Sequence, residues 1–207
     1  MNHYPPRTIF ILKNVISFEQ TDYPAAQQWI SLLYPHLKER NPLSLKYKPF
    51  GIEVPLDLKV VPLMLKEFNA RWYLIAHDLE TSKVRNYALD RIQSIEEYYF
   101  DLYQTKITFN PTTHFSDLVG VTVTDEGPKT IRFQTSPYLA NYIDTKKIHH
   151  TQRKLDKAEN LYELKAHINP ELIARFLSLG EDLWISAPKE LVERVRGKVA
   201  AMKEKYG

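Results

Sequence analysis

The chain has 207 residues, of which 43% are hydrophobic and 26% charged, and its formal net charge is +3. This balance is typical of a soluble globular protein with one large or two small domains, and so mild a charge does not by itself indicate nucleic acid. The absence of cysteine excludes disulfides and thiol chemistry. No run of about 18 apolar residues predicts a membrane span, and the N-terminus lacks the basic-then-apolar layout of a signal peptide. We therefore expect a cytoplasmic protein with no membrane partner.

Residues 1–40 predict a strand followed by a helix. Ile9–Phe18 is apolar and β-branched, as in a strand. Asp22 and Pro24 are typical of a helix start, where a carboxylate caps the first turn and proline occupies it. Pro35 is expected to end or kink this helix, because proline cannot donate the hydrogen bond of the helical ladder. The buried face is predicted from apolar residues at helical spacing, which are Ala25, Trp29, Leu32 and Leu33.

Residues 41–104 predict a small antiparallel barrel. The apolar period changes to two at Leu43, which indicates strands with one apolar face. Pro62 is expected to place part of the second strand at an edge or a bulge. Five short strands that follow a helix are typical of a small barrel. The expected strands cover residues 43–47, 58–68, 71–77, 84–89 and 92–103.

The remaining residues predict a connector, 105–118, and an α+β domain, 119–207. Asn110-Pro111 opens a short helix in the connector, and two strands are expected at residues 119–124 and 130–133 around a turn. Helices follow at 136–143, at 169–179 with Gly180 at the end, and from Pro188 onward, with strands at 161–168 and 183–186 between them. The last helix carries an apolar stripe of Leu191, Val195, Val199, Met202 and Tyr206.

Several of these segments resemble a known protein family. Leu45-Lys46-Tyr47, Pro62–Lys66, Arg71–Leu74 and Tyr87–Ile92 are similar to the WYL domain of bacterial transcriptional regulators. The second half resembles the WCX extension that follows this domain. The matching segments there are Ile148–Gln152, Phe176–Gly180, Ala187–Leu191 and Tyr206.

The resemblance implies a fold and a function. It implies an α+β protein in which a Sm-like or SH3-like antiparallel barrel, with a preceding helix, leads into an α+β WCX domain. In the family a winged helix-turn-helix comes first, and the barrel senses a nucleic-acid or nucleotide ligand. No such helix-turn-helix is visible before residue 24, so we expect a regulator fragment or a stand-alone sensor. Homodimerisation, and contact with DNA through a helix-turn-helix domain absent from this chain, are further expectations.

Two arginines and their aromatic neighbours are the candidate ligand-binding residues. Arg85 and Arg91 each offer a planar fork of donors that fits a phosphate group. Aromatic rings near them in the pattern are able to stack a base, and two lysines on the polar face of the first strand are second choices for a phosphate contact. The aromatic residues are Tyr47, Trp72 and Tyr73, and the lysines are Lys46 and Lys48.

These candidates also have structural interpretations. Tyr47 and Trp72 lie in alternating strands, where aromatic residues usually belong to the core, and we assign Trp72 mainly to structure. Arg91 is also able to pair with Asp90 or with a strand carbonyl. The lysines are equally consistent with solvated charges on a polar face.

An enzyme is not expected. The seven histidines are scattered without the helical spacing of a metal site, and there is no glycine-rich phosphate loop or nucleophile elbow. We therefore predict no catalytic residues, no metal and no cofactor. The alternative to a ligand sensor is a non-enzymatic protein-interaction or accessory scaffold module.

Overall fold

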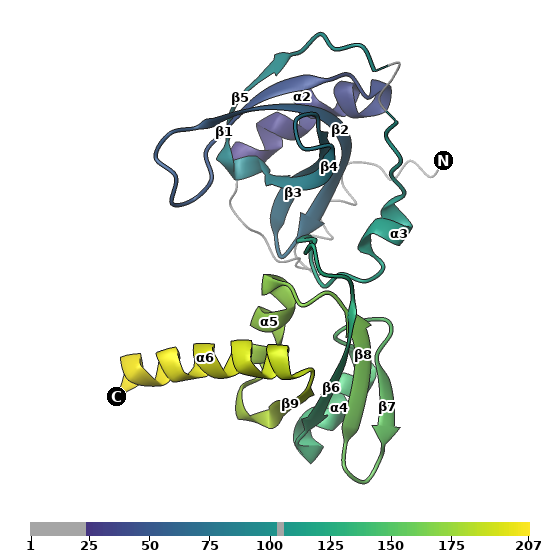
Figure 1. Cartoon of the computed structure of the whole chain (residues 1–207), viewed down its shortest axis with the longest axis vertical. Helices are drawn as coiled ribbons and strands as arrows, with labels where there is room; N and C mark the ends of the chain where they lie inside the picture. The colour runs from purple at the N-terminus through teal and green to yellow at the C-terminus, as the bar shows by residue number, and fades with distance from the viewer. Residues whose placement is uncertain (1–23, 103–105) are drawn as a thin grey trace, which may run out of the picture. The chain divides into compact units, whose positions relative to one another are not determined.

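The computed structural model describes residues 24–102 and 106–207, so the strand expected at Ile9–Phe18 and the cap expected at Asp22 lie outside the described residues. The chain divides into two compact units, Met1–Phe100 and Asp101–Gly207, each with one antiparallel sheet and helices (Figure 1). The α+β class expected from the sequence is confirmed. Within the described ranges no helix is long and apolar enough to cross a membrane.

The first unit is a helix followed by a five-stranded sheet. Its strands follow the order β4-β3-β2-β1-β5, and every neighbouring pair is antiparallel. The elements are α2 (Pro24–Glu39), β1 (Leu43–Tyr47), β2 (Leu56–Phe68), β3 (Arg71–Asp78), β4 (Lys83–Ala88), the 3-10 turn η1 (Leu89–Arg91) and β5 (Ile92–Glu97).

The closed barrel expected from the sequence is not formed. A barrel closes when its two edge strands pair, but β4 and β5 are the edges of this sheet, and no ladder in residues 24–102 joins them. After η1, β5 crosses to β1 and pairs with it through a register shift at Lys46/Tyr47. The same pairing ends β5 at Glu97, earlier than expected, because its partner Leu43 is the first residue of β1.

The core of the first unit lies between one face of the sheet and α2. The alternation in β1 buries Leu43 and Leu45, which pack with Leu74 of β3 and Leu33 of α2. Figure 1 shows α2 lying along the sheet. Of the two outcomes expected for Pro35, an end of the helix is not observed, because α2 continues to Glu39. Leu33 before the proline and Leu37 after it both pack on this core, which holds the helix together across the missing hydrogen bond.

Pro62 lies at an irregularity of β2. The pairing of β2 with β3 shifts register between Pro62 and Met64, so the bulge expected from the sequence is confirmed. The strand itself is central rather than an edge, because β1 pairs with it on the other side.

The second unit is a four-stranded sheet with three longer helices. Its strands follow the order β7-β8-β6-β9, and the core gathers Phe133, Tyr162, Leu164, Leu172 and Phe176. β7 was not expected from the sequence. The elements are α3 (Pro111–Phe115), β6 (Lys129–Thr135), α4 (Pro137–Thr145), β7 (Arg153–Asp156), β8 (Leu161–Ala166), α5 (Pro170–Leu177), η2 (Gly180–Asp182), β9 (Leu183–Ala187) and α6 (Lys189–Tyr206).

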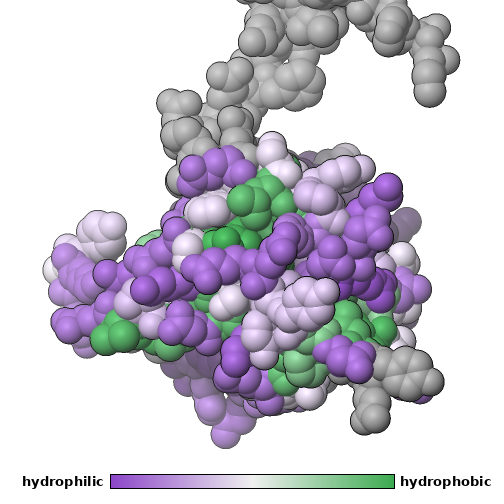
Figure 2. Space-filling view, turned by 90° about the horizontal axis from the view of Figure 1, so that it is seen from above, coloured by the Kyte–Doolittle hydropathy of each residue, from purple (hydrophilic) through white to green (hydrophobic). Residues whose placement is uncertain are grey.

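Hydrophilic and hydrophobic residues both reach the surface. On the face shown in Figure 2, hydrophobic residues reach the surface in separate patches among hydrophilic ones. Scattered apolar surface of this kind is ordinary in globular proteins.

Residues 119–124 form an irregular segment instead of the expected strand. Its polar backbone groups are satisfied by two side chains at the start of α5. The buried Asn169 donates from Nδ2 to the carbonyls of Val119 and Thr122, both at 2.9 Å, and Glu171 Oε1 accepts from the amide of Thr122 at 3.1 Å. Gly120 is required because its φ is +88° and a Cβ there would lie 2.7 Å from Glu171 Cγ.

Asn169→Asp separates the two functions of this amide. Its Oδ1 caps α5 by accepting from Leu172 N at 2.9 Å, and aspartate retains that acceptor but loses both Nδ2 donations. We expect a loss of about 3 kcal/mol in urea-induced unfolding of the full chain, because two half-buried carbonyls lose their donor and a carboxylate is placed in a fully buried position. Asn110→Asp, at the exposed cap of α3, is the matched control and leaves stability nearly unchanged. An equally small effect at residue 169 would contradict this role of the amide.

The turn from β3 to β4 depends on Asp78. Its carboxylate is buried and accepts from Thr81 N at 2.8 Å, Glu80 N at 3.0 Å and the hydroxyl of Tyr87 at 3.0 Å. Burial alone would raise the pKa of Asp78, but these hydrogen bonds to the charged form outweigh it and lower the pKa. Burial and the adjacent carboxylate raise the pKa of Tyr87, which therefore stays a donor.

Asp78→Asn is expected to cost about 2 kcal/mol at neutral pH, because it removes the charged acceptor of Tyr87. Since the pKa of Asp78 is lower in the folded chain, its contribution is complete above the unfolded-state pKa and is lost as the pH falls through the folded-state pKa. The stability difference between wild type and variant should therefore shrink on acidification, measured by urea unfolding from pH 7 downward. Asp156→Asn, in an exposed turn with the same amide contacts, is the control. A pH-independent difference would be incompatible with this origin.

Candidate ligand-binding site

The first unit carries a hollow beside η1 that we name the Arg91 hollow. It encloses about 340 Å³ and brings together two of the cations predicted from the sequence, Lys48 and Arg91. Lys48 follows β1, and its amide donates to the carbonyl of Arg91 at 3.0 Å, which fixes the two backbones side by side. The lining residues are Lys48, Pro49, Phe50, Gly51, Ile52, Asp90, Arg91, Ile92 and Gln93.

The guanidinium of Arg91 stacks on an aromatic ring. Its Cζ lies 3.8 Å from the centroid of Phe50, a cation–π distance, and the Phe50 side chain is 72% exposed. The Nε of Arg91 is buried and has no hydrogen-bond partner among the described residues. Asp90 pairs instead with Arg71, at 3.5 Å between Nε and Oδ1, so the alternative that Arg91 pairs with its neighbour is not what the structure shows.

The wall that holds Phe50 is a tight turn. The amide of Ile52 donates to the carbonyl of Pro49 at 3.4 Å, and Gly51 at the third position has φ +77°. A type II turn needs a positive φ at this position, which glycine supplies without strain. Pro49-Phe50-Gly51 was readable in the sequence as a strand break, but Phe50 was not predicted as a site residue. The sequence signal that identifies Phe50 is an aromatic residue between the proline and the glycine of such a turn, where its side chain is exposed.

The other predicted residues do not line the hollow. Arg85 is exposed on the edge strand β4, opposite Ala76 of β3. Lys46 is exposed on β1, between Asp57 of β2 and Ser94 of β5. The structure therefore gathers Lys48 and Arg91 and leaves Arg85 and Lys46 on separate surfaces of the same sheet.

The two units match two protein-family models. The WYL domain model matches residues 29–97, and the WCX domain model matches residues 128–203. This chain is a WYL-domain protein with a WCX extension. No curated protein matches its sequence.

Two solved structures resemble this WYL–WCX chain. Proteasome accessory factor B/C (PafBC) of Arthrobacter aurescens is 19% identical over 91% of this chain and 28% of its own, with a TM-score of 0.38. A CRISPR Cas-related protein is 12% identical over 88% of this chain and 51% of its own, with a TM-score of 0.55. The chain thus spans about half or less of either structure, and the second likeness concerns the fold alone.

The residues that name the WYL domain belong mostly to its scaffold. Trp72 packs against the core of the first unit, and Leu74 is fully buried there. Tyr73 lies between them on β3 and therefore faces the opposite side of the sheet. Tyr47 is buried with them: its hydroxyl accepts from Ala88 N at 3.3 Å, and its ring meets Tyr87 edge to face.

A similar structural role is filled in the WCX domain by Gln152. Its buried amide accepts from Ile148 N at 2.9 Å and donates to the carbonyl of Ile143 at 3.2 Å. The side chain thereby ties the end of α4 to the loop before β7. His149 beside it is buried and contacts Thr151 Oγ1 at 2.8 Å, whereas His150 is exposed.

Tyr47→Phe distinguishes scaffold from ligand contact. We expect the variant to lose about 1 kcal/mol of stability in urea unfolding, because the amide of Ala88 loses its acceptor in the core. Affinity for a nucleotide ligand should be unchanged. Tyr34→Phe, an exposed tyrosine of α2, is the control with no expected effect on either quantity. Weaker ligand binding at unchanged stability would instead make Tyr47 a ligand residue.

Proposed function

We propose that this WYL–WCX chain is the ligand-sensing region of a transcriptional regulator, in which the Arg91 hollow binds a phosphate-bearing ligand. The ligand class is a nucleotide or single-stranded nucleic acid. The observation that carries the proposal is the guanidinium of Arg91, which stacks on an exposed ring beside Lys48 and forms no ion pair among the described residues.

The chemistry of the hollow suits such a ligand. A guanidinium grips a phosphate through two parallel hydrogen bonds, and an ammonium such as that of Lys48 adds a point charge. Phe50 keeps a solvent-exposed surface on which a base is able to stack. A volume of about 340 Å³ lies near the lower end of the range for small-molecule sites and matches one nucleotide better than a duplex.

The position of η1 provides a route for a signal. Arg91 is its last residue, and η1 packs against both α2 and β3. A ligand held by Arg91 changes the state of the regulator only if it binds one arrangement of these elements more tightly than another. In this proposal α2 carries the change to a DNA-binding helix-turn-helix domain outside this chain, the WCX domain supports a homodimer, and neither unit is an enzyme or holds a cofactor.

Titration with a fluorescent oligothymidylate of about eight nucleotides tests the site. Arg91→Ala and Lys48→Ala should each weaken binding about tenfold, since each removes a charge-assisted phosphate contact. The slope of affinity against salt should fall by about 0.7 for each lost contact. Lys157→Ala, an exposed lysine in the turn between β7 and β8, is the matched control. Cyclic and linear nucleotides in parallel titrations distinguish a free nucleotide from a strand.

The same titration contains the outcomes that contradict the proposal. Absence of binding, or equal binding by Arg91→Ala, removes the Arg91 hollow as the site. Loss of affinity in Arg85→Ala alone moves the site to the exposed edge of β4. A partner contact that is insensitive to salt, without nucleic-acid affinity, favours the protein-interaction scaffold instead.

A further inference from the structure

The last helix, α6, exposes an apolar stripe. Its sequence places apolar side chains at helical spacing, but only the first of them, Leu191, is fully buried. Val199, Met202 and Tyr206 are 51%, 50% and 88% exposed. Figure 1 shows the C-terminal half of α6 extending away from the rest of its unit. Single exposed apolar residues are ordinary, but a continuous stripe along a helix marks a contact surface.

This stripe forms one wall of an apolar groove, which we name the α6 groove. It encloses about 490 Å³ between α6, the end of α5 and the edge strand β9. Its opposite wall includes Trp184, which is 49% exposed although its indole donates to Gln134 at 3.0 Å. The apolar side chains that line it include Leu177, Leu183, Trp184, Val195, Val199 and Met202.

Cations border the stripe on both sides. Arg196 lines the α6 groove, whereas Lys198 and Lys205 line a smaller hollow on the other side of Met202. None of them, nor Lys203, forms an ion pair with any carboxylate in the described part of the chain. The α6 groove also includes one carboxylate, Glu181, so cations outnumber carboxylates along the rim of the apolar surface.

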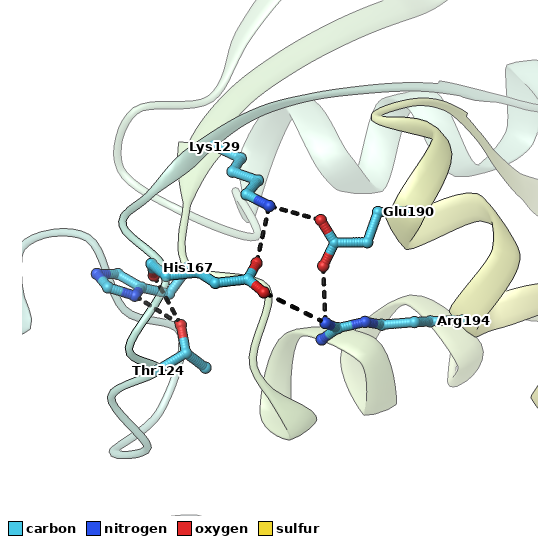
Figure 3. Close-up of polar contacts among 6 residues, drawn as sticks. Thr124, Lys129, His167, Glu190 and Arg194 are labelled. Atoms are coloured by element: carbon cyan, nitrogen blue, oxygen red, sulfur yellow. Dashed lines mark hydrogen bonds and ion pairs between the residues drawn. The ribbon is translucent and has the colours of Figure 1, made fainter.

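The carboxylates at the start of α6 are already engaged. Figure 3 shows Glu190 between Lys129 of β6 and Arg194. Its carboxylate accepts from Lys129 Nζ at 2.5 Å and lies 2.7 Å from Arg194 Nη2. Lys129 also donates to Glu126 at 2.7 Å, and both carboxylates raise the pKa of this lysine. Glu193 pairs with Lys189 at 3.6 Å. The network fixes the first turns of α6, and beyond Arg194 the helix carries one carboxylate, Glu204, among four cations.

We propose that the α6 groove docks an amphipathic helix of another protein whose apolar side is flanked by aspartate and glutamate. Val195, Val199, Met202 and Tyr206 follow one another at intervals of four, three and four residues, the repeat by which two helices interlock. In that repeat Arg196, Lys198, Lys203 and Lys205 occupy the positions beside the seam. Those positions select the charge of the partner.

The charge and shape of the surface disfavour other occupants. Two copies of α6 packed together would bring their rows of cations into contact, while Glu190 and Glu193 are already paired. A flat bilayer would leave a concave groove unfilled. Nucleic acid would gain little from the aliphatic walls formed by Leu177, Leu183 and Val199.

The test uses the full 207-residue chain and three synthetic peptides of about three heptads. One has leucine at the seam and glutamate beside it, one has lysine in place of the glutamate, and one is a scramble of the acidic peptide. Trp184 is the sole tryptophan of residues 101–207, so its fluorescence reports directly on the groove in a Trp29→Phe, Trp72→Phe background checked for folding by circular dichroism. We expect the acidic amphipathic peptide to bind at least about tenfold more tightly than the other two, since helical register and charge both contribute.

Two sets of variants locate the contact. Val199→Glu should weaken binding of the acidic peptide about tenfold, because it buries a charge in the seam. Ala200→Glu adds the same charge one residue away, off the stripe, and should change affinity far less. Arg196→Glu with Lys203→Glu should reverse the preference, so that the lysine peptide binds and the acidic one does not. All four substituted residues are exposed, and circular dichroism checks that each variant keeps the fold.

Other results overturn the proposal. Equal binding of the scrambled peptide means that the helix attracts acidic charge only. Capture by phosphatidylserine vesicles that Val199→Glu abolishes assigns the stripe to a lipid surface. A dimer in sedimentation equilibrium that Val199→Glu dissociates, without peptide affinity, assigns it to a second copy of the chain.

Discussion

The burial of Leu89 is the constraint on which the candidate site depends. This leucine is fully buried in the core of the first unit and anchors η1 between β4 and β5. Because a 3-10 turn points successive side chains in different directions, the next two residues leave the core. Asp90 meets Arg71 of β3, and Arg91 reaches the ring of Phe50. One short Leu-Asp-Arg segment thus carries a core anchor, an ion pair that holds the turn, and a cation directed at the hollow.

Local patterns in the sequence predict the elements of this WYL–WCX chain well. Alternation at Leu43–Tyr47 and the Asn-Pro and Ser-Pro helix starts identify elements whose determinants lie within a few residues. The failures have distant causes. Residues 119–124 lose their strand to Asn169 and Glu171, about 50 positions downstream, and barrel closure depends on a pairing between edges that no local pattern encodes. β7 is not predicted from the sequence because it is a short edge strand whose exposed residues show little apolar alternation.

The candidate site follows the same division. Basic residues in the WYL-like segments predicted Arg91 and Lys48 as ligand contacts, and the fold brings these two residues together. The same pattern also predicted Tyr47, Trp72 and Arg85. The ring of Tyr47 is part of the core and that of Trp72 packs against it, whereas Arg85 lies on an edge strand. Phe50 was missed because its role comes from a turn that directs it at Arg91. Spacing in α6 likewise identifies which side chains share a face, but whether the protein itself covers that face is a tertiary property.

Charge compensation separates structural cations from those with a further role. In the WCX domain Arg132 and Arg153 share Glu163, whose pKa they lower, and Lys154 holds Asp144. Both partners of each exposed ion pair lie within the WCX domain, and such pairs contribute little to the free energy of unfolding. Arg91 and the cations of α6 beyond Arg194 differ in having an aromatic or apolar concave surface beside them and in forming no ion pair among the described residues. The absence of an ion pair is not sufficient, since neither Arg85 nor Lys46 forms one within residues 24–102, although Lys46 lies opposite Asp57, and both lie outside the hollow. It is the concave surface beside an uncompensated charge that makes a ligand of opposite charge the favourable complement.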